Sequence, residues 1–175
     1  SPIRDLDSFT FNLDKKINIY SNRGASGIDG LISTAIGVSI GNKSFNALII
    51  GDVSFYYDLT ALNIANNIPV SLTIFIINNN GGHIFDRLDG LKNQSKLNYE
   101  KYWLTPVNLD IKSIAKAFNC HYHKIDLNQY EKIGKIVNQV NIKHKKINLV
   151  EIIVDSEKHH LDNKEIEDRI KQLFI

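Results

Sequence analysis

The stretch GDVSFYYDLTALNIANNIPVSLTIFIINNNGG, residues 51–82, decides the fold class of this chain. It begins with an acidic turn and continues through an amphipathic segment that predicts a helix over Asp58–Asn67. A continuous apolar run, Val70–Ile77, then predicts a buried strand, and Pro69 stands between the two, where it can end a helix. Because another apolar run, Asn46–Gly51, leads into the stretch, the whole segment predicts a strand–helix–strand unit with parallel strands.

The same alternation continues on both sides of this unit. Further strands are expected at Ile17–Tyr20, Tyr122–Ile125 and Ile147–Val154, and further helices at Gly27–Gly41, Asp110–Asn119, Leu127–Lys143 and Leu161–Phe174. Strands that are apolar on both faces are typical of parallel sheets covered on both sides. We therefore expect an α/β fold of three layers with a doubly wound, mainly parallel sheet. Asp86–Tyr102 has weak periodicity and is expected to be an active-site loop.

Composition restricts the class of protein further. The length of 175 residues suits one domain, and 43% hydrophobic with 23% charged residues is ordinary for a globular chain. A net charge of +2 without an aromatic–basic stripe argues against nucleic-acid binding, and no apolar run is long enough to span a membrane. The single cysteine, Cys120, excludes an internal disulfide and favours the reducing cytoplasm. Since the chain contains no methionine, we interpret residues 1–175 as one domain of a longer protein.

Polar residues follow both strands of the central unit. Asp52 follows the first strand and Asn78–Gly82 follows the second, so both lie where open α/β sheets bind ligands. A carboxylate, an amide oxygen and a glycine carbonyl form a hard site of low charge, which suits Mg²⁺ shared with phosphates. In a chain rich in asparagine, the triplet alone is more often an ordinary loop. The separation of 27 residues between Asp52 and Asn79, with a helix and a strand between them, favours the metal site.

Gly51–Asp52 followed at this separation by Asn78–Asn79 resembles the cofactor signature of the thiamine-diphosphate enzymes. Three segments narrow the resemblance: SNRGASGIDG (residues 21–30), GDVSFYYDL (residues 51–59) and NNNGGHIF (residues 78–85). Together they resemble the 2-succinyl-5-enolpyruvyl-6-hydroxy-3-cyclohexene-1-carboxylate synthases, which are transferases of menaquinone biosynthesis. The resemblance runs from PIRD (residues 2–5) through YWLTP (residues 102–106) to the last strand, and it implies the C-terminal, diphosphate-binding domain of such an enzyme.

This resemblance implies thiamine diphosphate as the cofactor, held by Mg²⁺ or Mn²⁺. The implied metal ligands are Asp52, Asn79 and Gly81. The implied cofactor contacts, besides the metal ligands, are Ser26, Ile28, Gly51, Val53, Ser54, Gly82 and Ile84. Ile28 is expected to act in catalysis as an apolar wedge that keeps the cofactor bent, although a core position in a helix over Gly27–Gly41 is the alternative. Val53 replaces a glycine of the general signature, which favours the narrower assignment.

The resemblance also implies the substrates. Arg4 and Arg23 are expected to bind substrate carboxylates through their guanidinium groups, and Arg23 is also expected to act in catalysis. Phe85 and Leu88 are expected to form an apolar wall beside the reacting carbon, and His83 stands where the family has Gln or Gly. The implied reaction decarboxylates 2-oxoglutarate and adds the succinyl carbanion to isochorismate. The family further implies an N-terminal pyrimidine-binding domain from a neighbouring subunit, a homodimer or homotetramer, and an inactive isolated chain.

Two alternatives stay open from the sequence. Another thiamine-diphosphate enzyme, such as an acetolactate synthase or a 2-oxoacid decarboxylase, shares the Asp52 and Asn79 signature but lacks NRGASGIDG at residues 22–30. A binding module without enzymatic activity, of flavodoxin or receiver type, shares the α/β architecture. A receiver domain requires an acidic pair after its first strand, whereas this chain has SNRGAS at residues 21–26.

Overall fold

The computed structural model describes residues 17–22, 27–42, 45–86, 95–126, 128–129, 131–140 and 146–173. Its described strands form one parallel sheet in the order β1-β2-β4-β3. The bounds are β1 (Asn46–Gly51), β2 (Leu72–Asn78), β3 (His121–Ile125) and β4 (Ile147–Ile153). The expected parallel α/β fold is therefore confirmed, and so is the adjacency of the two strands of the central unit, in which Gly51 pairs with Ile77.

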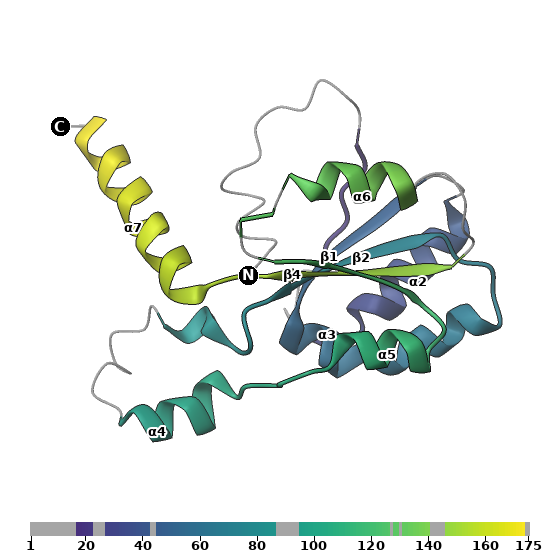
Figure 1. Ribbon diagram of the computed structural model, residues 1–175, viewed down its shortest axis with the longest axis horizontal. Coiled ribbons are helices and arrows are strands. Elements are labelled where there is room, and N and C mark those ends of the chain that lie inside the picture. The colour runs from purple at the N-terminus through teal and green to yellow at the C-terminus, as the bar shows by residue number, and fades with distance from the viewer. Residues whose placement is uncertain are drawn as a thin grey trace.

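Helices cover both faces of this sheet and complete three layers (Figure 1). One face carries α2 (Leu31–Gly41), α3 (Asp52–Asp58), the 3-10 helix η1 (Leu59–Asn66) and α5 (Ile111–Ala117), and the other carries α6 (Lys132–Val140). The remaining helices of the described ranges are η2 (His83–Phe85), α4 (Lys96–Tyr99), the π-helical η4 (Glu100–Leu104) and α7 (Ser156–Leu173). Over the ranges that the structure describes, none of these helices is long and apolar enough to cross a membrane.

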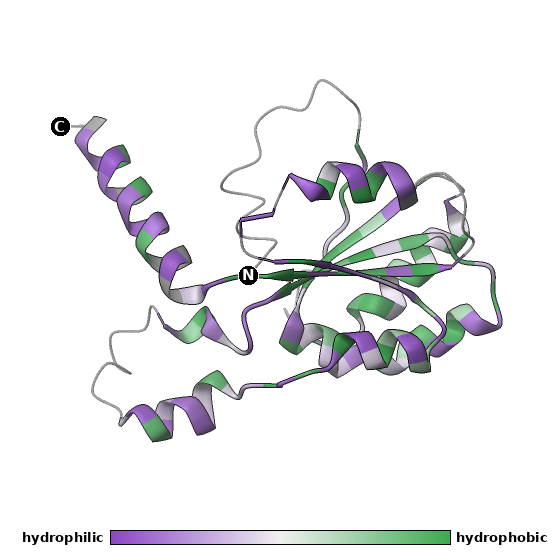
Figure 2. Cartoon of the chain, in the orientation of Figure 1, coloured by the Kyte–Doolittle hydropathy of each residue, from purple (hydrophilic) through white to green (hydrophobic). Residues whose placement is uncertain are grey.

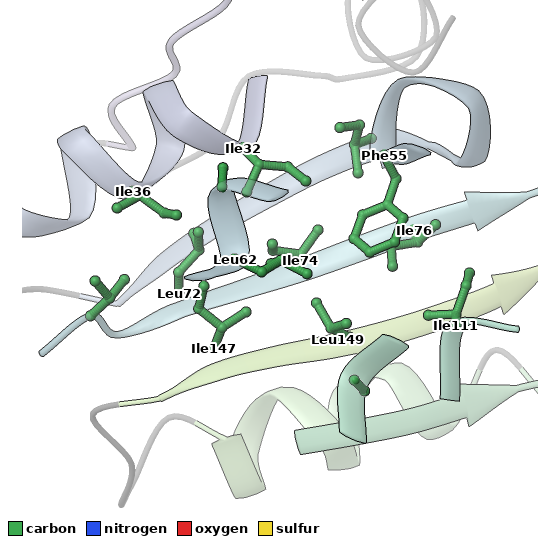
Figure 3. Close-up of a cluster of buried hydrophobic side chains, with 14 residues drawn as sticks. Ile32, Ile36, Phe55, Leu62, Leu72, Ile74, Ile76, Ile111, Ile147 and Leu149 are labelled. Atoms are coloured by element: carbon green, nitrogen blue, oxygen red, sulfur yellow. The ribbon is translucent and has the colours of Figure 1, made fainter. Parts of the chain in front are cut away.

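The larger core lies between the sheet and the four helices of the first face. Ile74 and Leu149 project from the strands toward Ile32 of α2, Phe55 of α3 and Leu62 of η1, and all of these side chains are fully buried (Figure 3). The strands are mainly apolar, while polar residues gather on the outer sides of the helices (Figure 2). Each such side chain contributes about 1.5–3 kcal/mol on burial, so this face anchors β1 and β2 beneath the loops that follow them.

Two expected elements differ at the amino-terminal side. Ile17–Tyr20 is not a strand, and the side chains of Ile17 and Ile19 are 58% and 63% exposed. β-branched residues favour strands only where they pack on a half-buried sheet surface, which this segment lacks among the described residues. The helix expected over Gly27–Gly41 begins only at Leu31, because Gly30 adopts a left-handed conformation with φ 71° that a helix interior does not accept.

The segment after β1 also differs from the expectation. The acidic turn is the start of α3, and Asp52 is its first residue, where a negative charge is favourable at a helix N-terminus. Only η1 corresponds to the helix expected at Asp58–Asn67. The expected loop Asp86–Tyr102 is helical from Lys96 onward, and the Ser95 hydroxyl accepts a hydrogen bond from the Asn98 N–H at 3.3 Å as an N-cap.

Candidate functional site

The loop after β2 and the helix that starts after β1 meet at the carboxyl edge of the sheet. Asp52 is only 2% exposed, and its Oδ2 accepts a hydrogen bond from the Gly81 N–H at 2.9 Å. The bond joins residues that are 29 positions apart in the sequence. The two strands therefore bring the acidic residue and the asparagine–glycine loop into direct contact, as their order in the chain predicts.

The side-chain amide of Asn79 faces both Asp52 and Gly81. One of its two polar atoms lies 3.2 Å from Asp52 Oδ1 and 3.1 Å from the Gly81 carbonyl oxygen. With the amide oxygen in that position, three oxygens converge; with the nitrogen there, the amide donates to both acceptors. Neighbouring oxygens around Mg²⁺ lie about 2.9 Å apart, because the ion has octahedral geometry with Mg–O distances near 2.1 Å. With the Asn79 oxygen turned toward Asp52 and Gly81, its distances to the other two oxygens are close to the spacing that a small cation requires.

The electrostatics of this site also fit a cation. Burial raises the pKa of the Asp52 carboxyl, and hydrogen bonds from the backbone N–H groups of Val53 and Gly81 offset only part of this effect. A buried carboxylate is costly unless an opposite charge or donors accompany it. Within the described ranges no three His, Cys, Asp or Glu side chains gather to form a metal site, so Asp52 contributes its charge alone. Such a site suits a divalent ion that shares its remaining coordination with an anion.

The shape of the loop is held by contacts with the last residue of η4 and with the chain that follows it. Gly81 has φ 142°, a conformation that favours glycine, and the Gly82 N–H donates to the Leu104 carbonyl at 2.7 Å. Asn80 and Asn108 exchange two hydrogen bonds, from Asn80 Nδ2 to Asn108 Oδ1 at 3.1 Å and from Asn108 N to Asn80 Oδ1 at 3.0 Å. Loop 78–82 is thus fastened along its length to residues 104–108.

Most residues expected to contact the cofactor lie around this loop or at the start of α3. Gly51 is the N-cap of α3 and supplies no side-chain cap, while Val53 and Ser54 are half-buried in the first turn. Ile84 is 51% exposed in η2. Ile28 is 41% exposed in the bend before α2, so the alternative that it occupies the core of a helix is wrong.

Residues expected near the substrate are described only in part. The ring of Phe85 packs edge-on against Trp103 with centroids 5.5 Å apart. His83 Nδ1 lies 2.8 Å from Asp86 Oδ2, and the Tyr99 hydroxyl donates to the same carboxylate. Burial and this hydrogen bond raise the pKa of Tyr99, so its hydroxyl remains a donor. The residues Arg4, Arg23, Ser26 and Leu88 lie outside the described residues.

Sequence reasoning missed a polar network beneath the loop. Glu151 of β4 is buried and accepts hydrogen bonds from Asn78 Nδ2, at 2.6 Å, and from the Tyr122 hydroxyl. The available signal was the glutamate itself, a charged residue inside the otherwise apolar run Ile147–Val154. A charge in such a strand indicates hydrogen-bonding partners on the neighbouring strands.

A hollow of about 310 Å³ lies at the opposite, amino-terminal edge of the sheet. Its lining includes Pro69, Cys120 and Lys146, and none of its lining residues belongs to loop 78–82 or to α3. Burial raises the pKa of the Cys120 thiol to about 11, so this thiol is protonated and a poor nucleophile near neutral pH. This hollow is therefore separate from the candidate site.

Comparisons with known proteins agree with this geometry. Residues 8–152 match a family described as "Thiamine pyrophosphate enzyme, C-terminal TPP binding domain". Thiamine pyrophosphate (TPP) is another name for thiamine diphosphate. The chain is 37% identical over 170 residues to the 2-succinyl-5-enolpyruvyl-6-hydroxy-3-cyclohexene-1-carboxylate synthase of Leuconostoc mesenteroides, covering 97% of this chain and 30% of that protein. It is 44% identical over 142 residues to the synthase of the same name from Christiangramia forsetii, covering 81% of this chain and 24% of that protein.

Among solved structures, the chain resembles the benzoylformate decarboxylase of Polynucleobacter necessarius with a TM-score of 0.58, covering 71% of this chain and 23% of that chain. At 14% identity this likeness is one of fold. The chain spans less than a third of the length of each of these relatives. The family match covers β1, β2 and β3, nearly all of β4, and both segments of the site. The chain therefore belongs to the thiamine pyrophosphate enzymes as a C-terminal cofactor-binding domain.

Proposed function

We propose that this chain is the diphosphate- and Mg²⁺-binding domain of a synthase that decarboxylates 2-oxoglutarate and adds the succinyl unit to isochorismate in menaquinone biosynthesis. The observation that carries this proposal is the convergence of Asp52, Asn79 and the Gly81 carbonyl at the carboxyl edge of the sheet. The names of the relatives in Leuconostoc mesenteroides and Christiangramia forsetii support the proposed reaction, because both name a synthase of the product that the sequence resemblance implies.

In this proposal the residues of the two loops divide the work. Asp52, Asn79 and the Gly81 carbonyl would hold Mg²⁺ or Mn²⁺, which would help to bind the diphosphate. Gly51 and Gly82 have no side chains, so they let the diphosphate approach the backbone closely. Ser54 and the backbone of Val53, in the first turn of α3, and the backbone of Gly82 contribute polar contacts to the phosphate oxygens. Asp52 would thus gain an opposite charge that compensates the burial of its carboxylate.

The other residues act toward the bent cofactor and the substrates. Bound thiamine diphosphate supplies the nucleophilic carbon and the electron sink for decarboxylation of a 2-oxoacid. Ile28, exposed before α2, and Ile84, exposed in η2, offer apolar surface to the cofactor. Arg4 and Arg23 bind substrate carboxylates, and Phe85 and Leu88 exclude water beside the reacting carbon. A pyrimidine-binding domain of a neighbouring subunit completes the site in a homodimer or homotetramer, so the isolated chain is inactive.

The test is made on the intact protein that contains this chain. Calorimetric titration with thiamine diphosphate should give binding only with a divalent cation, and the loaded enzyme should consume 2-oxoglutarate and isochorismate together. Asn79→Ala should remove metal-dependent binding. Asn67→Ala is the matched control, since Asn67 belongs to the other asparagine pair, is exposed, and lines the hollow at the opposite edge of the sheet. Cofactor binding that persists in Asn79→Ala contradicts the metal site, and turnover of a 2-oxoacid without isochorismate contradicts the reaction.

A further inference from the structure

A buried carboxylate lies beneath loop 78–82, outside the residues proposed to hold the metal. Glu151 of β4 is 6% exposed, and its neighbours along the strand, Val150 and Ile152, are part of the apolar core on the other face. A buried charge destabilises a protein unless hydrogen bonds or an opposite charge compensate it. Apolar residues of similar volume often replace buried ionic groups without loss of stability. The sheet alone therefore does not require a glutamate here.

Each oxygen of this carboxylate accepts a hydrogen bond from a neighbouring strand. Asn78 Nδ2 of β2 donates to Glu151 Oε1 at 2.6 Å, and the Tyr122 hydroxyl of β3 donates to Oε2. Burial and the Glu151 hydrogen bond raise the pKa of Tyr122, which keeps its hydroxyl protonated as a donor. Hydrogen bonds to a carboxylate are short and strong, so Glu151 is held rigidly between β2 and β3.

Asn78 connects this carboxylate to the loop. Its Oδ1 accepts a hydrogen bond from the Asn80 N–H at 3.1 Å, and its backbone carbonyl accepts one from the Val154 N–H at 3.0 Å. The Asn78 amide therefore cannot rotate without losing the bond to Glu151 at one end and the bond to Asn80 at the other. Asn80 has φ 58°, a left-handed conformation that an asparagine tolerates when its neighbours fix the backbone.

We infer that Glu151 is a positioning residue for the metal loop. It orients the Asn78 amide, and Asn78 in turn fixes the path of residues 79–81 so that the Asn79 amide and the Gly81 N–H face Asp52, with the Gly81 carbonyl beside the Asn79 amide. The inference rests on the proposed function, since it concerns metal affinity. Residues that orient metal ligands typically change metal affinity by about 10–100-fold when they are replaced.

The test compares variants of the intact protein by Mg²⁺ titration at saturating thiamine diphosphate, with melting curves recorded with and without both ligands. Glu151→Gln keeps the size of the side chain but removes the charge that fixes Asn78, and it should weaken Mg²⁺ binding by about 10–100-fold. Tyr122→Phe is the matched control, because it removes the other hydrogen bond to Glu151 and leaves Asn78 in contact. Its effect on Mg²⁺ affinity should be less than about fivefold, below the usual range for a residue that orients a ligand.

A double-variant comparison separates positioning from a general structural role. In an Asn78→Ala background, Glu151→Gln should change Mg²⁺ affinity little, because the connection is already lost. Unchanged Mg²⁺ affinity in Glu151→Gln, whatever its melting temperature, overturns the inference. Asp52→Asn distinguishes the proposed metal site from the positioning role of Glu151. This variant should abolish Mg²⁺ binding if the metal site is correct. If Asp52→Asn binds Mg²⁺ normally, the proposed function fails first; if only Glu151→Gln is normal, the inference alone fails.

Discussion

Replacing Gly81 by alanine should damage both the loop and the sheet beneath it. A Cβ at this position would lie 2.6 Å from the Leu104 carbonyl oxygen and 3.0 Å from two carbon atoms of the Leu104 side chain. The nearest of these is a backbone atom, so no change of rotamer removes the overlap. The φ of 142° adds strain, because residues with a Cβ rarely adopt it.

The magnitude follows from these two effects. A residue held at a disfavoured φ costs about 1–3 kcal/mol, and overpacking in a tight site costs about 1–3 kcal/mol more. The sum of about 2–6 kcal/mol is a large part of the 5–15 kcal/mol by which a typical domain is stable. Two glycines of the same site provide controls. At Gly51, with φ −78°, an added Cβ would have open space around it. At Gly82 an added Cβ would lie 3.2 Å from the Trp103 carbonyl oxygen, a tight contact that is less severe than the one at Gly81.

Hydrogen exchange of the β2 amides in the cofactor-free intact protein measures the free energy of opening of this sheet. Gly81→Ala should increase the exchange rate by at least about thirtyfold, since about 1.4 kcal/mol corresponds to a factor of ten. Gly82→Ala should have a smaller effect. Gly51→Ala should slow exchange slightly. Alanine lowers the conformational entropy of the unfolded chain, which stabilises the folded state by up to about 1 kcal/mol. Equal exchange in the three variants would refute the argument, because close approach to Leu104 would then not constrain Gly81.

Three further predictions concern residues elsewhere in the chain. Arg23→Ala should lower kcat/KM for the acidic substrates by roughly 10- to 100-fold, as expected for the loss of a charge-assisted contact. The affinity for thiamine diphosphate, measured by calorimetry, should stay unchanged. An equal loss of cofactor affinity would assign Arg23 to the diphosphate. Because burial raises the pKa of Cys120 to about 11, the rate of its alkylation by iodoacetamide should be low at pH 8 and rise toward pH 11. Fast alkylation at neutral pH would contradict the burial of this thiol. Burial and the neighbouring His121 lower the pKa of His123 in the folded protein. The imidazole therefore binds a proton more tightly in the unfolded chain, where its pKa is near 6.5. The free energy of unfolding should consequently fall as the pH is lowered through that value. His123→Gln should reduce that slope in melting curves, and an unchanged slope would exclude His123.

The central unit could be predicted from the sequence because its information is local. Apolar runs at Asn46–Gly51 and Val70–Ile77 predict buried strands, and a helical segment between them makes the strands parallel. Parallel neighbours end at the same edge, so the contact between Asp52 and the loop after β2 followed from order alone and is confirmed by the Gly81 hydrogen bond. The roles of Asn79 and Gly81 toward a metal remain predictions.

Other features depended on tertiary contacts, which the hydrophobic periodicity of the sequence does not reveal. Ile17–Tyr20 has the composition of a strand but no partner among the described residues, and α2 starts late because Gly30 is left-handed. The depth at which Asp52 is buried also depends on packing, since the sequence placed it in a turn. Burial and backbone conformation at these positions are set by neighbours distant in the chain.

The sequence by itself therefore determined the α/β alternation and the single edge at which the two polar loops meet, because both follow from residues close together in the chain. Only the tertiary structure decided the support beneath that edge. β4 lies between β2 and β3, so Glu151 contacts Asn78, 73 positions earlier, on one side and Tyr122 on the other. Hydropathy predicts which segments form the buried strands, but the order of strands in the sheet decides which buried polar groups meet.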